Sequence, residues 1–461
     1  MPGTGIAPAR RYADRRAHRH EPALEEGASR GRSLWIIPAL SGVVAGITSV
    51  GRLWLANPEV LGQVLWAEDG LFPLCAMQSG FLTCLFEPFA GYLLFAPRVI
   101  AGLVALMPLV DWATFANGIA AAVAGIIAFT VTWHLMGQRF GKVASFAVGQ
   151  LPVLLPLVGL ESINSIGSMY MLMLFLVFMM VALPSPGTSS TWLTAALIVI
   201  TALTIPSVIV VAFIVALLLL RSWIEVRQAR IWLISLGVGL LPQALVIITA
   251  EERRPLETSA SALLAWMDGV ATASVSLIPG LALMGRAPSF DALEVVGWQH
   301  PGVIMTLAAV GAGVIAYLRT RRPLMGQLSV LALAGVLASL IPAAISGPSN
   351  RYFVIPLLCW VAALLLALDD WARRRSRSLL VPGMVLVLGL LWWPALPASP
   401  FRASSAPDWS IVVTRAQAEC GLKPNGTASF LFSPNWPYGD GGLPMPRVLP
   451  CWMVQAKLRA E

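Results

Sequence analysis

Two adjacent carboxylates, Glu68 and Asp69, are the residues of this sequence best suited to proton transfer. They lie in the segment 66–70 (WAEDG), just after the first long apolar run, in a chain with only 12% charged residues. Neighbouring side chains point well apart on a helix and to opposite sides of a strand, so the two cannot act together on one substrate atom. We expect one to face a reaction site as a general base, while the other anchors the loop, binds a cation or caps the following helix. The alternative is a helix cap at the membrane interface with both charges in solvent.

Two arginines in regions of low charge are suited to holding an anionic group, above all a phosphate. Arg98 ends the segment 91–98 (GYLLFAPR), which also carries Tyr92, and Arg351 precedes Tyr352 after a Gly-Pro turn. A guanidinium offers a fixed fork of donors that matches phosphate oxygens. The alternative is that these side chains extend to the interface and pair with lipid headgroups.

Glu161 and Asn164 are further polar candidates, because they follow the apolar segment 143–160 at its outer end. We expect these two polar side chains at a membrane boundary to line the same cavity as the acidic pair and the arginines. The sequence has no P-loop, no GxGxxG motif in a strand-helix setting, no zinc-protease motif and no credible Ser-His-Asp arrangement. It indicates no cofactor and no metal site, although an acidic pair is compatible with a divalent cation.

The composition is that of a membrane protein. Hydrophobic residues make up 57% of the 461 residues, and the charged fraction of 12% is half of the roughly 25% typical of soluble domains. Apolar runs of roughly 18 residues or more recur along the whole chain, which is typical of transmembrane helices. The net charge of +8 comes from short basic clusters between these runs, as in cytoplasmic loops, so nucleic acid is not an expected partner.

The placement of Lys and Arg predicts an all-α polytopic membrane protein with about eleven spans, a cytoplasmic N-terminus and an extracytoplasmic C-terminus. The long run 191–220 is broken at residues 204–207, so we divide it into two short helices. The predicted spans are 34–55, 112–135, 143–160, 166–183, the two halves of 191–220, 231–250, a helix ending at Arg319, 324–345, a helix ending before Arg373, and 379–396.

The same assignment divides the chain into three parts. Residues 1–33 are expected to form a disordered basic cytoplasmic tail, and residues 34–396 a transmembrane domain with outer loops at 56–110 and 251–302. Within the first loop, 92–109 is predicted to be a helix along the membrane surface. Residues 397–461 are expected to form a small extracytoplasmic domain. The excess of Arg over Lys and the many Ala residues indicate a bacterium, so the expected location is the bacterial cytoplasmic (inner) membrane.

The C-terminal domain is predicted to be α+β, with a helix at 409–419 and strands at 428–433 and 448–454. A segment this small buries little hydrophobic core, so it must pack on the membrane domain or be cross-linked by a disulfide.

Four of the five cysteines lie in regions predicted to be outside, and they form two local pairs. We predict the disulfides Cys75–Cys84 and Cys420–Cys451, because an oxidising compartment permits them and the small tail needs one. Cys359 stands alone inside a predicted span. The alternative is that all are buried free thiols, and no histidine near either pair supports zinc.

The acidic pair in the first outer loop, followed by a surface helix, many spans and an outer C-terminal appendage, resembles the GT-C-type membrane glycosyltransferases. The segments 66–70 and 91–98 also resemble a group of bacterial integral membrane proteins. The resemblance covers most of 34–396 in architecture, and the C-terminal segment is smaller than the soluble domains of several GT-C members. In GT-C enzymes an acidic residue of the first outer loop is the expected base, so the resemblance implies that role for Glu68 or Asp69.

The implied activity is transfer of a sugar from a polyprenyl-phosphate-linked donor to an envelope glycan or lipid acceptor on the outer face of the membrane. Glu68 or Asp69 would take the proton of the acceptor hydroxyl, and Arg98 or Arg351 would stabilise the departing phosphate. The expected partners are therefore membrane lipid, the lipid-linked donor and the acceptor. The alternatives are a transporter or flippase of a lipid-linked saccharide, and a non-catalytic membrane protein of envelope assembly.

Overall fold

The computed structural model describes residues 26–56, 65, 67–89, 91–138, 140–155, 166, 169–185, 187–249, 260–275, 301–346, 353–377, 379–392, 408–430 and 448–458. Almost all of these residues are helical. The helices are α1 (Glu26–Ala56), α2 (Ala67–Ser79), α3 (Phe81–Phe86), α4 (Phe95–Leu106), η2 (Leu109–Asp111), α5 (Trp112–Gly137), α6 (Lys142–Leu154), α8 (Tyr170–Ala182), α9 (Thr188–Thr204), η3 (Pro206–Ile209), α10 (Val210–Leu220), α11 (Val226–Thr249), α12 (Ala260–Val275), α14 (Pro301–Arg319), α15 (Pro323–Ser346), α16 (Val354–Arg374), α17 (Leu380–Trp392), α19 (Trp409–Leu422) and α20 (Cys451–Leu458).

Five of these helical segments are long and apolar enough to cross a membrane: Trp35–Leu53, Leu109–Gly137, Val226–Thr249, Pro323–Ile341 and Val354–Arg374. The other predicted spans are also apolar helices, but each is shorter, between 10 and 17 residues within the described part of the chain. About 20 helical residues are needed to cross the hydrocarbon layer. The structure therefore agrees with an all-α membrane protein, and the count of eleven spans stays a prediction.

Two local predictions about helix ends can be compared with the structure directly. The predicted break in the run 191–220 is confirmed, because α9 ends at Thr204 and Pro206 opens η3. Proline has no N–H to donate to the preceding turn, so the helix cannot continue through it. The start of the first helix differs, because α1 begins at Glu26 and extends into the segment predicted to be a disordered tail.

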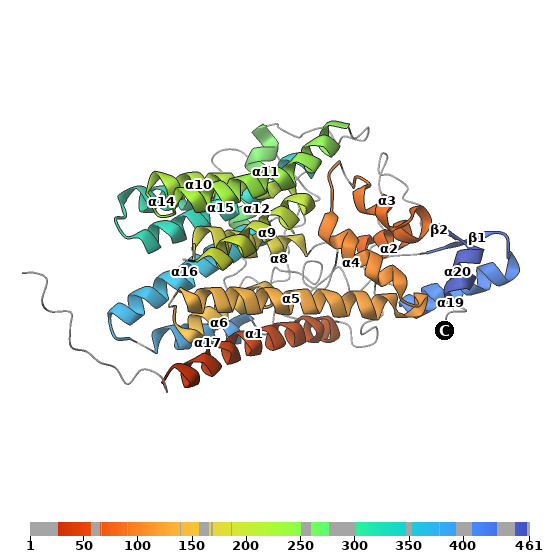
Figure 1. Ribbon diagram of the computed structural model, residues 1–461, viewed down its shortest axis with the longest axis horizontal. Coiled ribbons are helices and arrows are strands. Elements are labelled where there is room, and N and C mark those ends of the chain that lie inside the picture. Colours follow the sequence, from red (N-terminus) through yellow and green to blue (C-terminus); the bar gives the residue numbers. More distant parts are fainter. Residues whose placement is uncertain are drawn as a thin grey trace, which may run out of the picture.

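The two ends of the bundle differ in composition. At one end, the Gly141 N–H donates to the Asp369 carboxylate at 2.9 Å, joining the start of α6 to the end of α16. Arg221, which follows α10, donates to the carbonyls of Tyr317 and Leu318 at the end of α14. Helices α10 and α14 lie on the left of Figure 1. Basic residues therefore gather at this end, as the charge pattern predicts, and its assignment to the cytoplasm remains a prediction. They include Lys142, Arg221, Arg319, Arg373 and Arg374.

The opposite end carries the first predicted outer loop and the C-terminal appendage, which lie together on the right of Figure 1. The Trp409 indole N–H donates to the Leu109 carbonyl at 2.7 Å, and its ring stacks on Trp112 at a centroid distance of 6.1 Å. Lys457 on α20 donates to the Ala105 carbonyl at the end of α4. The appendage therefore packs on α4, η2 and the start of α5.

The appendage itself agrees with the sequence prediction in most elements. The predicted helix is α19, and β1 (Thr427–Ser429) pairs antiparallel with β2 (Val448–Pro450), so that Ala428 faces Leu449. The predicted strand 448–454 is wrong beyond Pro450, because Cys451 begins α20. Proline lacks the N–H that would extend the strand ladder. The Cys420–Cys451 disulfide, with Cα atoms 5.1 Å apart, then joins α19 to α20 and confirms that predicted pair.

Candidate active site

Helix α2 carries the acidic pair in its first turn. Carboxylates there are stabilised by the positive end of the helix dipole. The Asp69 side chain is only 1% exposed, whereas the side chain of Glu68 lies outside the described part. The alternative of two solvated charges is therefore wrong for Asp69. A buried carboxylate is costly to keep unless it is used or compensated, so Asp69 is the stronger candidate of the two.

Phe72 connects Asp69 to Arg98. Residues three apart on a helix share one face, so Phe72 lies beside Asp69 on α2. The Arg98 guanidinium carbon lies 5.1 Å from the centroid of the buried Phe72 ring. Phe89 meets the same ring edge to face, with centroids 5.3 Å apart. The site therefore forms where α2, the turn before α4 and α4 itself pack together.

Arg98 is buried within the protein, at 2% exposed. The alternative that it extends to lipid headgroups is therefore wrong. Its Nη1 donates to the Cys84 carbonyl, whereas Nε and Nη2 have no hydrogen-bond partner within the described part of the chain. Burial lowers the pKa of Arg98 to about 10, and Glu87 opposes this lowering. The side chain stays charged at neutral pH, and its Nε and Nη2 edge is buried without a hydrogen-bond acceptor among the described residues.

The second predicted disulfide closes the hairpin that surrounds Arg98. Cys75 on α2 is joined to Cys84 on α3, with Cα atoms 5.7 Å apart, which confirms this pair as well. The Cys75 Sγ lies 3.0 Å from Glu87 Oε2. Within the described residues, these three side chains are the only group of three potential metal ligands, and the disulfide occupies both sulfurs. The fifth cysteine, Cys359, is free and buried in α16.

The start of α4 is fixed by two other helices. The Gln243 side chain of α11 both accepts from the Leu93 N–H and donates to the Leu93 carbonyl, each at 2.9 Å. The Ala96 N–H donates to the Thr204 hydroxyl at the end of α9, at 3.1 Å. Tyr92 lies in the turn just before, where its backbone pairs with Phe89. The segment that carries Tyr92 and leads into Arg98 is thus held against the end of α9 and against α11.

Four predicted binding residues are not part of this geometry. Glu161, Asn164, Arg351 and Tyr352 lie outside the described residues. Their roles remain predictions.

Arg52 on α1 is a buried charge that the sequence analysis missed. Its side chain is 2% exposed, and Nη1 donates to the carbonyls of Val153 at 2.9 Å and Leu155 at 3.3 Å. These carbonyls end α6, where a cation is stabilised by the helix dipole. Arg52 is the one charged residue in the apolar segment 34–55, and that isolation was the available signal.

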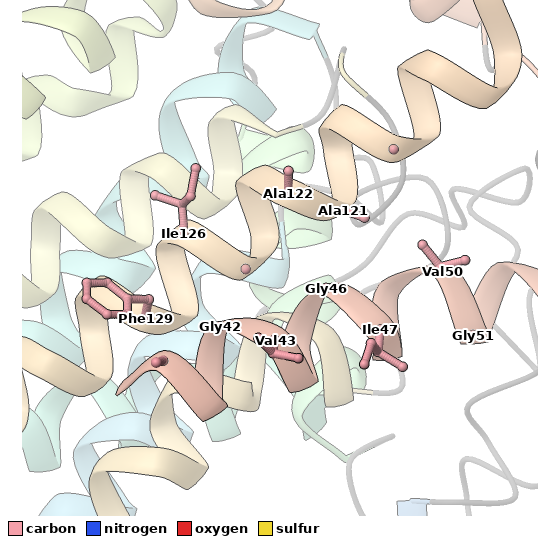
Figure 2. Close-up of a pocket in the computed structure, with 13 residues that line it drawn as sticks. Gly42, Val43, Gly46, Ile47, Val50, Gly51, Ala121, Ala122, Ile126 and Phe129 are labelled. Atoms are coloured by element: carbon pink, nitrogen blue, oxygen red, sulfur yellow. The ribbon is translucent and has the colours of Figure 1, made fainter. Parts of the chain in front are cut away.

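An apolar groove of about 810 Å³ lies between α1 and α5 (Figure 2). The helices approach closely there, because a Cβ added to Gly125 would lie 2.8 Å from the Gly42 carbonyl oxygen. Only Gly, Ala, Val, Ile and Phe residues line the groove. Such a lining offers no group for proton transfer or phosphate binding, so the groove is not the reaction site.

Comparison with known proteins identifies no family. No family sequence profile matches the chain, and no curated protein matches its sequence. Among solved structures, the chain is similar to the oligosaccharyltransferase of Archaeoglobus fulgidus in complex with zinc and sulfate, with a TM-score of 0.43 and 13% identity. The match covers 88% of this chain and 59% of the oligosaccharyltransferase chain.

Proposed function

We propose that this protein is a membrane glycosyltransferase that transfers a sugar from a polyprenyl-phosphate-linked donor to an envelope glycan or lipid acceptor. The observation that carries the proposal is the burial of Asp69 on α2 and of Arg98 on α4, two helices that pack together, with the Arg98 guanidinium carbon 5.1 Å from the Phe72 ring of α2. Buried charges in a membrane protein are rare and costly, and they usually mark a functional site. Here one group is a carboxylate that can accept a proton, and the other has two donor atoms without a partner among the described residues.

The two groups supply the two electrostatic needs of sugar transfer. Asp69 would accept the proton of an acceptor hydroxyl as its oxygen attacks the anomeric carbon, and the bond from that carbon to the donor phosphate would break with inversion. The electron pair would leave with the phosphate, whose growing charge Arg98 would stabilise through Nε and Nη2. Arg351 remains a second candidate for the same phosphate. A lipid-linked donor follows from the proposed outer location, where nucleotide sugars are absent.

The proposal is tested by sugar transfer in proteoliposomes that contain the purified protein, radiolabelled polyprenyl-phosphate sugars and envelope acceptors. Asp69→Asn should lower transfer by about 10²–10⁴-fold, the usual contribution of a general base. Asp111→Asn is the matched control, because Asp111 is an exposed carboxylate at the same end of the molecule. Equal transfer by wild type and Asp69→Asn would exclude Asp69 as the base. Movement of the lipid-linked saccharide across the bilayer without transfer would instead identify a flippase.

The same assay tests whether sugar transfer requires a divalent cation. Transfer that survives chelation with EDTA would show that the acidic pair needs no divalent metal. Transfer lost with EDTA and restored by one added metal would assign the cation to the site.

A further inference from the structure

The contacts of the Arg98 guanidinium come from the hairpin that the Cys75–Cys84 disulfide closes. Its Nη1 donates to the Cys84 carbonyl and lies 3.6 Å from the Cys84 Sγ. Its Cζ lies over the Phe72 ring, 5.1 Å from the centroid, and Phe72 precedes Cys75 by three residues on α2. The hairpin therefore contacts the guanidinium from both α2 and α3.

The disulfide fixes these two contacts relative to each other. Phe72 and Cys75 share one face of α2, whereas the carbonyl that accepts from Arg98 belongs to Cys84 on α3. Gly80 joins the two helices with a φ of 83°, a left-handed conformation that glycine adopts readily. Without the covalent bond, the two helices are connected only through this turn and their packing. The distance between the Phe72 ring and the Cys84 carbonyl would then vary.

We propose that the Cys75–Cys84 disulfide is a positioning element that holds the Arg98 guanidinium so that its free Nε and Nη2 edge receives the phosphate of the lipid-linked donor. This inference rests on the proposed function. Two-point recognition of phosphate depends on the orientation of the guanidinium plane, and a side chain fixed in advance loses less entropy on binding. Cys75 and Cys84 thus act through Arg98 and do not touch the reacting atoms.

The second disulfide provides a matched control within the same protein. Cys420–Cys451 joins α19 and α20 of the appendage, whereas the contacts of the Arg98 guanidinium described above come from Phe72 and Cys84. A general loss of stability should follow removal of either bond. Only removal of Cys75–Cys84 should change the environment of Arg98.

The first experiment needs no substrate. The purified full-length protein in detergent is treated with phenylglyoxal, and modification of each arginine is followed by peptide mass spectrometry. In Cys75→Ser/Cys84→Ser, Arg98 should be modified about tenfold faster than in wild type, the effect expected from loss of roughly one hydrogen bond. Arg52 is equally buried but bound to α6, so its modification rate should not change. Cys420→Ser/Cys451→Ser should leave the Arg98 rate as in wild type.

The second experiment measures the donor KM. The Cys75→Ser/Cys84→Ser variant should raise the KM with little change in kcat, and the same change made in an Arg98→Ala background should have no further effect. If the disulfide is only structural, its removal should impair donor use by the same factor in the Arg98→Ala background as in wild type. An unchanged Arg98 modification rate, or equal acceleration at Arg52, overturns the inference.

The two experiments separate this inference from the proposed function. Absence of any transfer by wild type removes the proposed function, whereas the modification rates still test the positioning of Arg98. If the serine variant does not fold, the bond is instead reduced with a phosphine in the Cys420→Ser/Cys451→Ser background, where Cys75–Cys84 is the one disulfide left among the described residues. Faster modification of Arg98 alone supports the inference there, and no change refutes it.

Discussion

Replacing Arg98 with methionine should raise the donor KM while leaving the fold close to its wild-type stability. Methionine keeps much of the length of the arginine side chain but removes the charge. Burial lowers the pKa of Arg98 to about 10, which corresponds to about 3 kcal/mol against the charged form that the variant regains. Against this, the Cys84 carbonyl loses its donor, at about 1–3 kcal/mol, and Phe72 loses a cation–π contact of about 1–2 kcal/mol. These opposing effects leave a net change between about 1 kcal/mol of stabilisation and about 2 kcal/mol of destabilisation.

Arg52→Met is the matched control for this prediction. Arg52 is as buried as Arg98, but its Nη1 satisfies two carbonyls at the end of α6. The cost of burying the charge is regained in both variants, but Arg52→Met leaves two carbonyls without that donor where Arg98→Met leaves one. We therefore expect Arg52→Met to lose more free energy of unfolding, by about 1–3 kcal/mol for the additional carbonyl. The measurement is the thermal unfolding temperature of each purified variant in the same detergent, together with the donor KM in proteoliposomes.

The outcome that refutes the reasoning is equally specific. If Arg98→Met lowers the unfolding temperature as much as Arg52→Met, the Arg98 guanidinium serves to stabilise the fold. Its donors without a partner among the described residues then do not mark a binding site. If Arg98→Met is as stable as wild type but transfers sugar with an unchanged KM, the phosphate is bound elsewhere, and Arg351 becomes the candidate.

Three further predictions concern the elements that support the site. Gly125→Val should lower the unfolding temperature by overpacking the α1–α5 contact, at about 1–3 kcal/mol, whereas Gly118→Ala has open space and should not; thermal unfolding distinguishes them. Trp409→Ala should release the appendage, because it loses both a hydrogen bond and a stacked ring, and limited proteolysis should then remove the appendage faster than in wild type. The Ser429 N–H donates to the Glu419 carboxylate and, together with Arg415, lowers the pKa of Glu419 below its usual value of 4.5. The stability that this ionised carboxylate contributes is therefore complete above pH 4.5 and is lost as the pH falls through the lowered pKa of the folded protein. Hydrogen exchange at Ser429 should accelerate in that acidic range in wild type, and Glu419→Gln should not show the same pH dependence.

The sequence predicted features that depend on local chemistry. The break before Pro206 follows from the missing proline N–H, and the helix at 409–419 from its apolar spacing. The two disulfides followed from an even number of cysteines in two local pairs. Each of these signals lies within a short stretch of chain.

Features that depend on packing between distant segments were not predictable in the same way. Whether Glu68 or Asp69 faces inward is decided by how α2 sits against α4, and no periodicity in a short interrupted segment reveals that. Arg98 was expected at a surface, but α2 and α3 cover it. The strand predicted at 448–454 ends at Pro450, and Cys451 begins α20, where it is bonded to Cys420 of α19. Arg52 was missed although its isolation in an apolar segment was visible.

The central claim is that Asp69 and Arg98 form one reaction site. The most direct test is a steady-state measurement of sugar transfer from a polyprenyl-phosphate donor by Asp69→Asn and Arg98→Met in proteoliposomes. We expect Asp69→Asn to lower kcat by about 10²–10⁴-fold at an unchanged donor KM, and Arg98→Met to raise the donor KM. Wild-type kcat and KM in both folded variants would contradict the claim.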